Sequence, residues 1–152
     1  MNEAEKYGNL MISEVWDLML KCQSAQELYK IISLQNSKSF ALILRAHFMD
    51  KTSFKINQIP IYERNTAPEG LAETNLRVEA ERLYGILFGN TSTNDVRRSI
   101  LLSELLSGID RKDAYLVEHI IESEPGSDFK KLSHNMKEWV MEQTAKFVPT
   151  NI

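Results

Sequence analysis

Residues 40–48 read FALILRAHF, a short run that is apolar over much of the surface of a helix. The residues that share one helical face are Phe40, Ala41, Leu44 and Phe48, and Leu42 and Ile43 widen it. Ser37 precedes the run, where a serine hydroxyl can accept a hydrogen bond from a free N–H of the first helical turn. The pattern therefore predicts a helix that begins after Ser37 and lies at the centre of the core.

Two further helices are predicted before this run. Apolar residues recur at helical intervals between Met11 and Cys22, and Trp16 is expected to join the same core. Ser24 and Glu27 then have the S-x-x-E spacing of a capping box, which predicts a short second helix that buries leucine and isoleucine side chains.

The stretch after the central run reads TSFKINQIPIYERNTAPEGL, residues 52–71. Its apolar residues are spaced by two, which is typical of an extended chain, and two prolines remove backbone donors that a helix would need. Because these apolar side chains need burial, we expect an arm pinned across the helices, or a small hairpin, near residues 51–73.

Four more helices are predicted after the arm. Thr74 is the expected cap of the first, which Gly89 ends in the left-handed conformation common at helix C-termini. Thr93 or Asn94 opens the next, which ends at Gly108. The remaining signals are Asp110 as a cap, Pro125 and Gly126 as a stop, Ser133 as the start of the last helix and Pro149 beyond it.

These patterns predict an all-α fold, a single compact domain of six to eight helices that spans residues 1–152, with frayed ends at 1–9 and 149–152. The expected core residues are Leu18, Leu28, Phe40, Leu44, Leu83, Leu101, Leu105, Val117, Ile120 and Trp139.

Composition narrows the class of protein. Cys22 is the one cysteine, so an intrachain disulfide is impossible, and no run approaches the ~18 apolar residues of a membrane span. The first residues, MNEAEKYGNLM, lack the apolar core of a signal peptide, so we expect a cytoplasmic location. The net charge of -3 argues against strong non-specific binding to nucleic acid.

The lack of known catalytic and cofactor-binding motifs predicts a protein that is not an enzyme and that has no cofactor. The sequence contains no phosphate-binding loop, dinucleotide-binding turn or nucleophile elbow. The segment VEHIIE brings Glu118, His119 and Glu122 within one helical turn, but it lacks the second histidine of a zinc-binding H-E-x-x-H motif. We therefore expect no metal site.

Two sets of residues are candidates for binding. Basic residues near the arm and at helix starts can contact phosphate, because helix N-termini also favour anions. This first set is Lys51, Lys55, Arg64, Arg97, Arg98, Arg111 and Lys112. Apolar residues of the arm can anchor a protein partner if they are exposed. This second set is Phe54, Ile59, Ile61 and Tyr62.

The order of several segments along the chain resembles that in a known protein family. FALILRAHF, the PEGL turn at 68–71, RLYGILFG and RRSILLSELLSGIDRKDAYLVEHII together resemble a family of small uncharacterised proteins of large tailed bacteriophages, over roughly residues 25–140. More distantly, the chain is similar to the N-terminal helical DNA-binding domain of ATP-dependent DNA ligases. That likeness implies duplex or nicked DNA as a partner without ligase activity, and the phage likeness implies the cytoplasm of a bacterial host.

Two functions therefore remain open. The first is a non-enzymatic phage accessory protein that binds DNA through the basic residues. The second is a protein–protein adaptor or inhibitor that binds a host or phage protein through the apolar arm residues. A coherent basic groove favours the first, and basic residues scattered among carboxylates beside an apolar patch favour the second.

Overall fold

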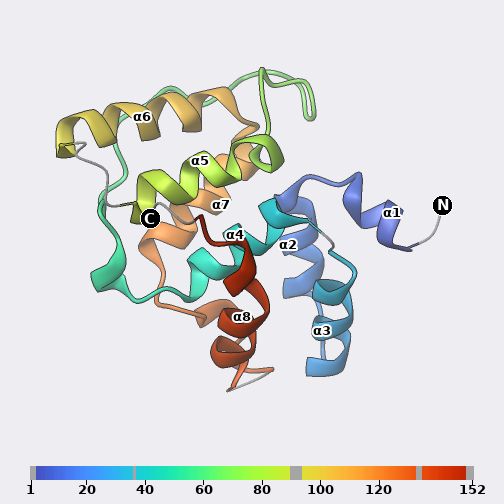
Figure 1. Ribbon diagram of the computed structural model, residues 1–152. Helices are drawn as coiled ribbons and strands as arrows, with labels where there is room; N and C mark the ends of the chain where they lie inside the picture. The colour runs from blue at the N-terminus through green and yellow to red at the C-terminus, as the bar shows by residue number, and fades with distance from the viewer. Residues whose placement is uncertain (1–2, 36, 90–93, 133–134, 150–152) are drawn as a thin grey trace.

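The central helix is α4, Lys38–Phe48, as the run FALILRAHF predicts. Ser37 Oγ accepts a hydrogen bond from the Phe40 N–H at 3.2 Å, which confirms the predicted cap. Eight of the eleven helical residues are buried, because α4 packs against α5, α7 and α8. In the computed structural model (Figure 1), which describes residues 3–35, 37–89, 94–132 and 135–149, α4 lies in the middle of the molecule.

Three helices precede α4: α1, Glu3–Gly8; α2, Ile12–Leu20; and α3, Ala25–Ser33. Helices α2 and α3 correspond to the two predicted helices, whereas α1 has no counterpart in the sequence analysis. Ser24 caps α3 by accepting from the Glu27 N–H at 3.2 Å. The Glu27 carboxylate accepts from the Gln23 N–H. In a capping box it would accept from the N–H of the cap residue itself, Ser24.

Four helices follow the arm: α5, Leu76–Phe88; α6, Asp95–Gly108; α7, Arg111–Glu122; and α8, Met136–Thr144. Asn94 and Asp110 cap α6 and α7 as predicted. The cap of α5 is Asn75 rather than Thr74, since the Asn75 side chain accepts from Val78 N. The predicted start at Ser133 lies outside the described residues. Short 3-10 helices are η1, Lys51–Ser53; η2, Ser127–Phe129; and η3, Ala145–Phe147.

The end of α5 differs from the prediction. Gly89 has φ −70°, so it is not left-handed, and the helix stops by turning into extended backbone. Glycine is needed there for another reason: a Cβ at this position would lie 2.5 Å from Gly85 O. A side chain at residue 89 would therefore collide with the backbone of the preceding helical turn.

The arm is an extended segment and not a hairpin, and the described residues contain no strand. It leaves α4 through η1, donates from Lys55 N to Leu87 O at 2.7 Å, and runs past α7 and the end of α6 before it reaches α5 (Figure 1). Among the described residues, no backbone-to-backbone hydrogen bond involves residues 56–66. Side chains must therefore hold this part of the arm in place.

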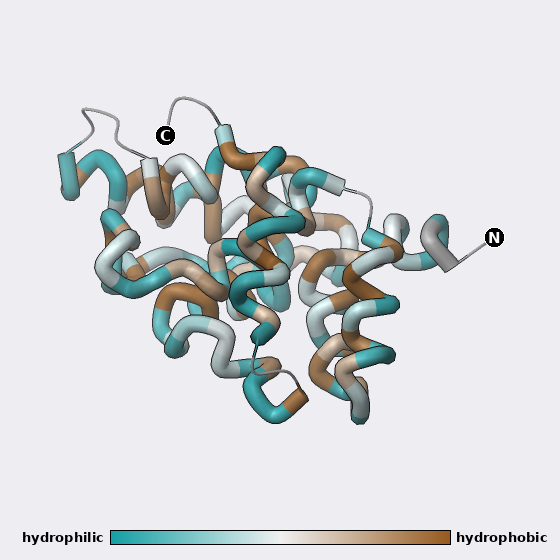
Figure 2. Tube along the Cα trace, turned by 60° about the horizontal axis from the view of Figure 1, so that its bottom comes forward, coloured by the Kyte–Doolittle hydropathy of each residue, from teal (hydrophilic) through white to brown (hydrophobic). Residues whose placement is uncertain are grey.

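One hydrophobic core joins α2 to α8, and apolar and polar residues alternate along the helices (Figure 2). The predicted core residues that are buried are Leu28, Phe40, Leu44, Leu83, Leu105, Val117 and Ile120. Leu18, Leu101 and Trp139 are only partly buried. Leu18 differs because the buried face of α2 consists of Ile12, Val15, Trp16 and Met19. No helix of the described residues is long and apolar enough to cross a membrane.

Candidate functional site

The arm is fastened to α7 by one cluster of four side chains. Tyr62 donates its hydroxyl hydrogen to Glu118 Oε2 at 2.5 Å. Arg64 donates to both oxygens of Glu118, at 2.6 and 3.1 Å, and to the Tyr62 hydroxyl at 2.8 Å. Its guanidinium carbon lies 3.9 Å from the centre of the Tyr115 ring. Paired hydrogen bonds and ring stacking of this kind fix an arginine more firmly than one exposed ion pair does.

This cluster shifts the pKa values of its members. Partial burial raises the pKa of Glu118, but the hydrogen bonds from Arg64 and Tyr62 outweigh it and hold that pKa below its usual value. Burial and the hydrogen bond to Glu118 raise the pKa of Tyr62. Glu118 is therefore a carboxylate at neutral pH, and Tyr62 is a neutral donor to it.

The four apolar arm residues predicted to bind a partner have different environments. Phe54 packs on the Phe88 ring with 4.7 Å between centroids, and Ile59 packs on the core. Tyr62 is partly buried beside Glu118. Ile61 is 100% exposed, although both of its neighbours in sequence are partly buried. Ile61 therefore lies outward on a part of the arm that is fixed on both sides, and Leu71 near the end of the arm is 71% exposed as well.

A second network lies on α7 one turn beyond Tyr115. His119 Nε2 lies 2.7 and 2.9 Å from the two oxygens of Asp128 in η2. Trp16 Nε1 of α2 donates to the same carboxylate at 2.9 Å. The Asp128 N–H donates to Nε2 of His47 on α4 at 3.3 Å. Asp128 therefore links three helices that are far apart in sequence.

His47 is the buried member of this network. Its side chain is fully covered and packs edge-on against Trp16 and Phe129. Burial lowers the pKa of His47 to about 4, although the nearby Asp128 carboxylate opposes this shift. His47 is therefore neutral at physiological pH, which agrees with its role as the acceptor of the Asp128 N–H.

A pocket of about 420 Å³ opens between α2 and α7 beside this network. Its lining residues include Trp16, Leu20, Tyr115, Leu116 and His119. Leu20 is 49% and Tyr115 is 52% exposed, so both side chains reach solvent at the edge of this pocket. We call Ile61 and Arg64 of the arm, together with Tyr115 and the pocket residues Leu20 and His119, the Tyr115 surface.

Four of the seven predicted phosphate-binding residues have contacts within the chain. Lys51 Nζ donates to the carbonyls of Ile120 and Ile121 at the end of α7, and Lys112 pairs with Glu69 at 3.1 Å. Arg64 holds the arm on Glu118, as described above. Arg98 is buried and donates to the carbonyls of Ile86 and Gly89 at the end of α5.

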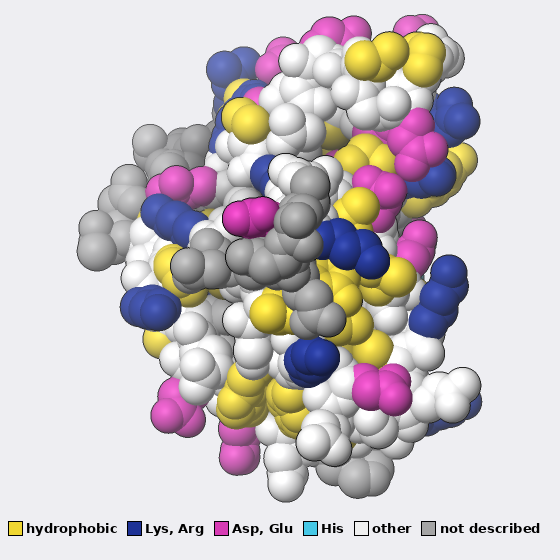
Figure 3. Space-filling view, turned by 90° about the vertical axis from the view of Figure 1, so that its right-hand side faces the viewer, with side chains coloured by type: hydrophobic (Ala, Val, Ile, Leu, Met, Phe, Trp, Pro, Cys, Tyr) yellow, Lys and Arg dark blue, Asp and Glu magenta, His cyan; other side chains and the backbone are white. Residues whose placement is uncertain are grey.

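The other three, Lys55, Arg97 and Arg111, are exposed, and their side chains have no partner in the described part of the chain. Arg97 and Arg111 are well separated, because Arg97 lies in the first turn of α6 and Arg111 begins α7, beyond the other end of α6, whose 14 residues span about 21 Å. On the face shown in Figure 3, basic side chains are likewise separated by carboxylates and apolar groups. The described residues also contain no group of three or more metal-ligating side chains.

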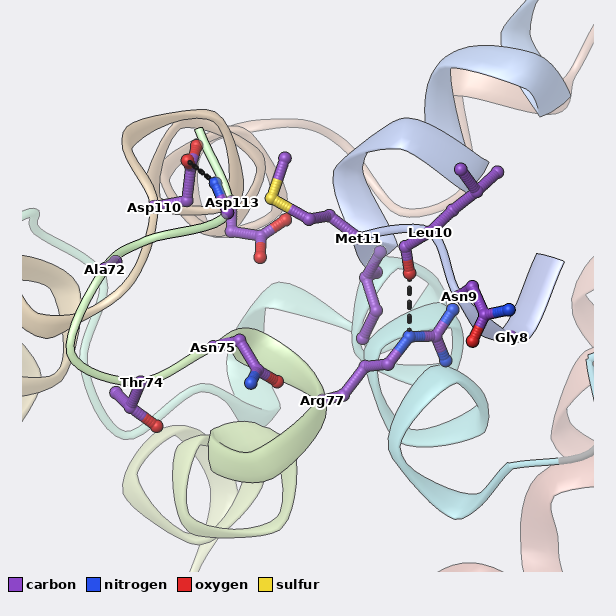
Figure 4. Close-up of a pocket in the computed structure, with 12 residues that line it drawn as sticks. Gly8, Asn9, Leu10, Met11, Ala72, Thr74, Asn75, Arg77, Asp110 and Asp113 are labelled. Carbon is purple, nitrogen blue, oxygen red and sulfur yellow. Dashed lines mark hydrogen bonds between the residues drawn. The ribbon is translucent and has the colours of Figure 1, made fainter. Parts of the chain in front are cut away.

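A smaller pocket of about 260 Å³ lies where the arm meets the linker between α1 and α2 (Figure 4). Arg77 donates to Leu10 O at 2.9 Å and to Tyr7 O at 3.0 Å. Asp113 accepts from the Ser13 N–H at 3.0 Å, so a residue of α7 caps α2. Burial raises the pKa of Asp113, although the interaction with Ser13 opposes the shift. The charged groups of this pocket thus join segments of the fold.

Comparisons with family models, curated proteins and solved structures find no match for this chain. Ile61 and Arg64 are candidates from the sequence, whereas Tyr115, Leu20 and the His119–Asp128 pair are not. Glu118 and His119 share one helical turn in the sequence, and the structure gives them different partners, Arg64 and Asp128. Long-range pairs of this kind leave no local pattern in a sequence.

Proposed function

We propose that this protein is a non-enzymatic adaptor or inhibitor that binds another protein through the Tyr115 surface. The observation that carries the proposal is Ile61, which is fully exposed on an arm held by Ile59 and by the contacts of Tyr62 and Arg64 with Glu118. Tyr115 and Arg64 lie at the same anchor, and tyrosine, tryptophan and arginine are the residue types that carry most binding energy in protein interfaces.

The geometry also lowers the entropic cost of binding. A flexible arm would lose conformational freedom when a partner ordered it, at roughly 0.5–1.5 kcal/mol for each immobilised side chain. Arg64 is already fixed by Glu118 and Tyr115, and the arm is anchored by burial on either side of Ile61. The surface is therefore organised before a partner arrives.

DNA binding remains the second candidate, but the placement of the basic residues favours it less. Duplex affinity depends mainly on lysine and arginine side chains that neutralise phosphates. Lys51 and Arg98 already satisfy backbone carbonyls, and Arg64 and Lys112 already pair with carboxylates. The resemblance to phage proteins fits either candidate, with a host or phage protein as the partner in the adaptor case.

Site-specific photocrosslinking tests the adaptor proposal. The photoreactive amino acid p-benzoylphenylalanine is placed at Ile61 or at Tyr115, and in a control at Glu142, which is exposed on α8. Illumination in the cells that make the protein is expected to give the same discrete protein adduct from positions 61 and 115, and not from 142. No adduct at either position, or equal adducts at all three, contradicts the proposal.

Fluorescence anisotropy with intact, nicked and single-stranded DNA tests the second candidate. The adaptor proposal predicts no measurable duplex binding at physiological salt. Tight binding that weakens steeply as salt rises, and that is lost when Lys55, Arg97 and Arg111 are all replaced by alanine, would instead establish the DNA function.

A further inference from the structure

The pocket between α2 and α7 has the size and lining of a site for one organic group. Its volume of about 420 Å³ lies in the range of small-molecule sites, roughly 300–1,000 Å³. Trp16, Leu20, Tyr115 and Leu116 supply apolar and aromatic walls. His119 adds a polar ring whose side chain is 46% exposed.

The hydrogen bonds around Asp128 determine which nitrogen of His119 carries the proton. A carboxylate only accepts, so in the neutral form of the His119 ring the proton lies on Nε2, at 2.7 Å from Oδ1. Nδ1 then carries a lone pair, and it has no partner among the described residues. Trp16 fixes the carboxylate with its own N–H, so this tautomer is held in place.

We propose that this pocket recognises the phenol side chain of a tyrosine from the protein partner, with the hydroxyl hydrogen donated to Nδ1 of His119. A phenol suits both parts of the site, because its ring matches the aromatic and aliphatic walls and its hydroxyl matches the free acceptor. Lys112, which also lines the pocket, is paired with Glu69, so the site favours a neutral group over an anion. This inference rests on the proposed function, since the phenol belongs to the partner.

Binding of p-cresol tests the inference without any partner. The chain has two tryptophans, so its nitrogen–proton NMR spectrum contains two indole signals, and Trp139→Phe identifies that of Trp16. The expected result is that p-cresol shifts the Trp16 signal. We also expect p-cresol to bind about fivefold more tightly than 4-methylanisole, which keeps the oxygen but lacks the donor; one neutral hydrogen bond supplies about this ratio.

Two variants test the role of His119. His119→Phe removes the acceptor and keeps a ring, and Asp128→Asn presents an amide donor to Nε2, which moves the ring proton to Nδ1. Both are expected to abolish the preference for p-cresol, with folding checked by circular dichroism. The inference is overturned if p-cresol leaves the Trp16 signal unchanged, if 4-methylanisole binds equally well, or if a folded variant keeps the preference. Such a failure leaves the crosslinking result at Ile61 untouched, so the two proposals fail separately.

Discussion

At the scale of single residues, two adjacent arginines have different roles. Arg98 is 5% exposed and its guanidinium closes the end of α5, while Arg97 is exposed on the first turn of α6. The same formal charge is therefore structural at one position and free for contact at the next.

Replacing each arginine with alanine separates these roles. Arg98→Ala leaves the carbonyls of Ile86 and Gly89 without their donor, so we expect a loss of about 1–3 kcal/mol in the free energy of unfolding. Arg97→Ala is the matched control and should change stability by less than about 0.5 kcal/mol. Urea denaturation measures both, and equal losses would show that Arg98 is not a structural cap.

His47 predicts a dependence of stability on acid. Its pKa is about 4 in the fold and about 6.5 when unfolded, so between these values the unfolded chain binds a proton that the folded chain does not. The contribution of His47 is therefore fully present above pH 6.5 and is lost as the pH falls toward 4, at no more than about 1.4 kcal/mol per pH unit. His47→Gln keeps an acceptor for the Asp128 N–H but does not titrate.

The measurement is the urea midpoint from pH 8 to pH 4.5 for the two proteins. The wild-type midpoint should fall more steeply below pH 6.5 than that of His47→Gln. Parallel curves would mean that His47 does not titrate at this lowered pKa.

At the scale of elements, the arm depends on side chains because its backbone from 56 to 66 makes no backbone-to-backbone hydrogen bond with the described residues. Glu118 of α7 accepts from two of these side chains, Tyr62 and Arg64. Phe54 and Ile59 are packed against the core, and Phe54 lies on Phe88 of α5 rather than on α7.

Glu118→Ala should therefore loosen the arm without unfolding the helices. We expect chymotrypsin to cleave after Tyr62 at least several-fold faster, while the helical circular dichroism stays unchanged. Glu122→Ala is the control, because Glu122 is exposed one turn further along α7. Equal cleavage rates in the two variants would show that Glu118 does not hold the arm.

Local signals allowed most elements to be predicted from the sequence. Ser24, Ser37, Asn94 and Asp110 cap the helices that they were expected to cap, because a cap involves residues only a few positions apart. The sites of Arg98 and Glu118 could not be predicted. Their partners depend on which helix ends and loops meet in three dimensions, and a basic residue that closes a helix looks the same in sequence as one that faces solvent.

At the scale of the whole molecule, the core is organised around α4, which packs against α5, α7 and α8. Leu44 of α4 and Leu105 of α6 are each 1% exposed. Leu44→Ala and Leu105→Ala should each lower the free energy of unfolding by about 2–5 kcal/mol. Leu18→Ala, at a partly buried position, should cost less, and a larger loss there would contradict the assigned core.

The central claim is that the arm and α7 form a surface for a protein partner and that the exposed cations do not form one for DNA. Quantitative capture from nuclease-treated extract of the producing cells tests it most directly, with wild type, an Ile61→Asp and Tyr115→Ala double variant, and a Lys55, Arg97 and Arg111 triple alanine variant. We predict that the triple variant retains the crosslinked partner at the wild-type level and that the double variant loses most of it. Loss of capture in the triple variant but not in the double variant, or loss in every sample on nuclease treatment, would contradict the account.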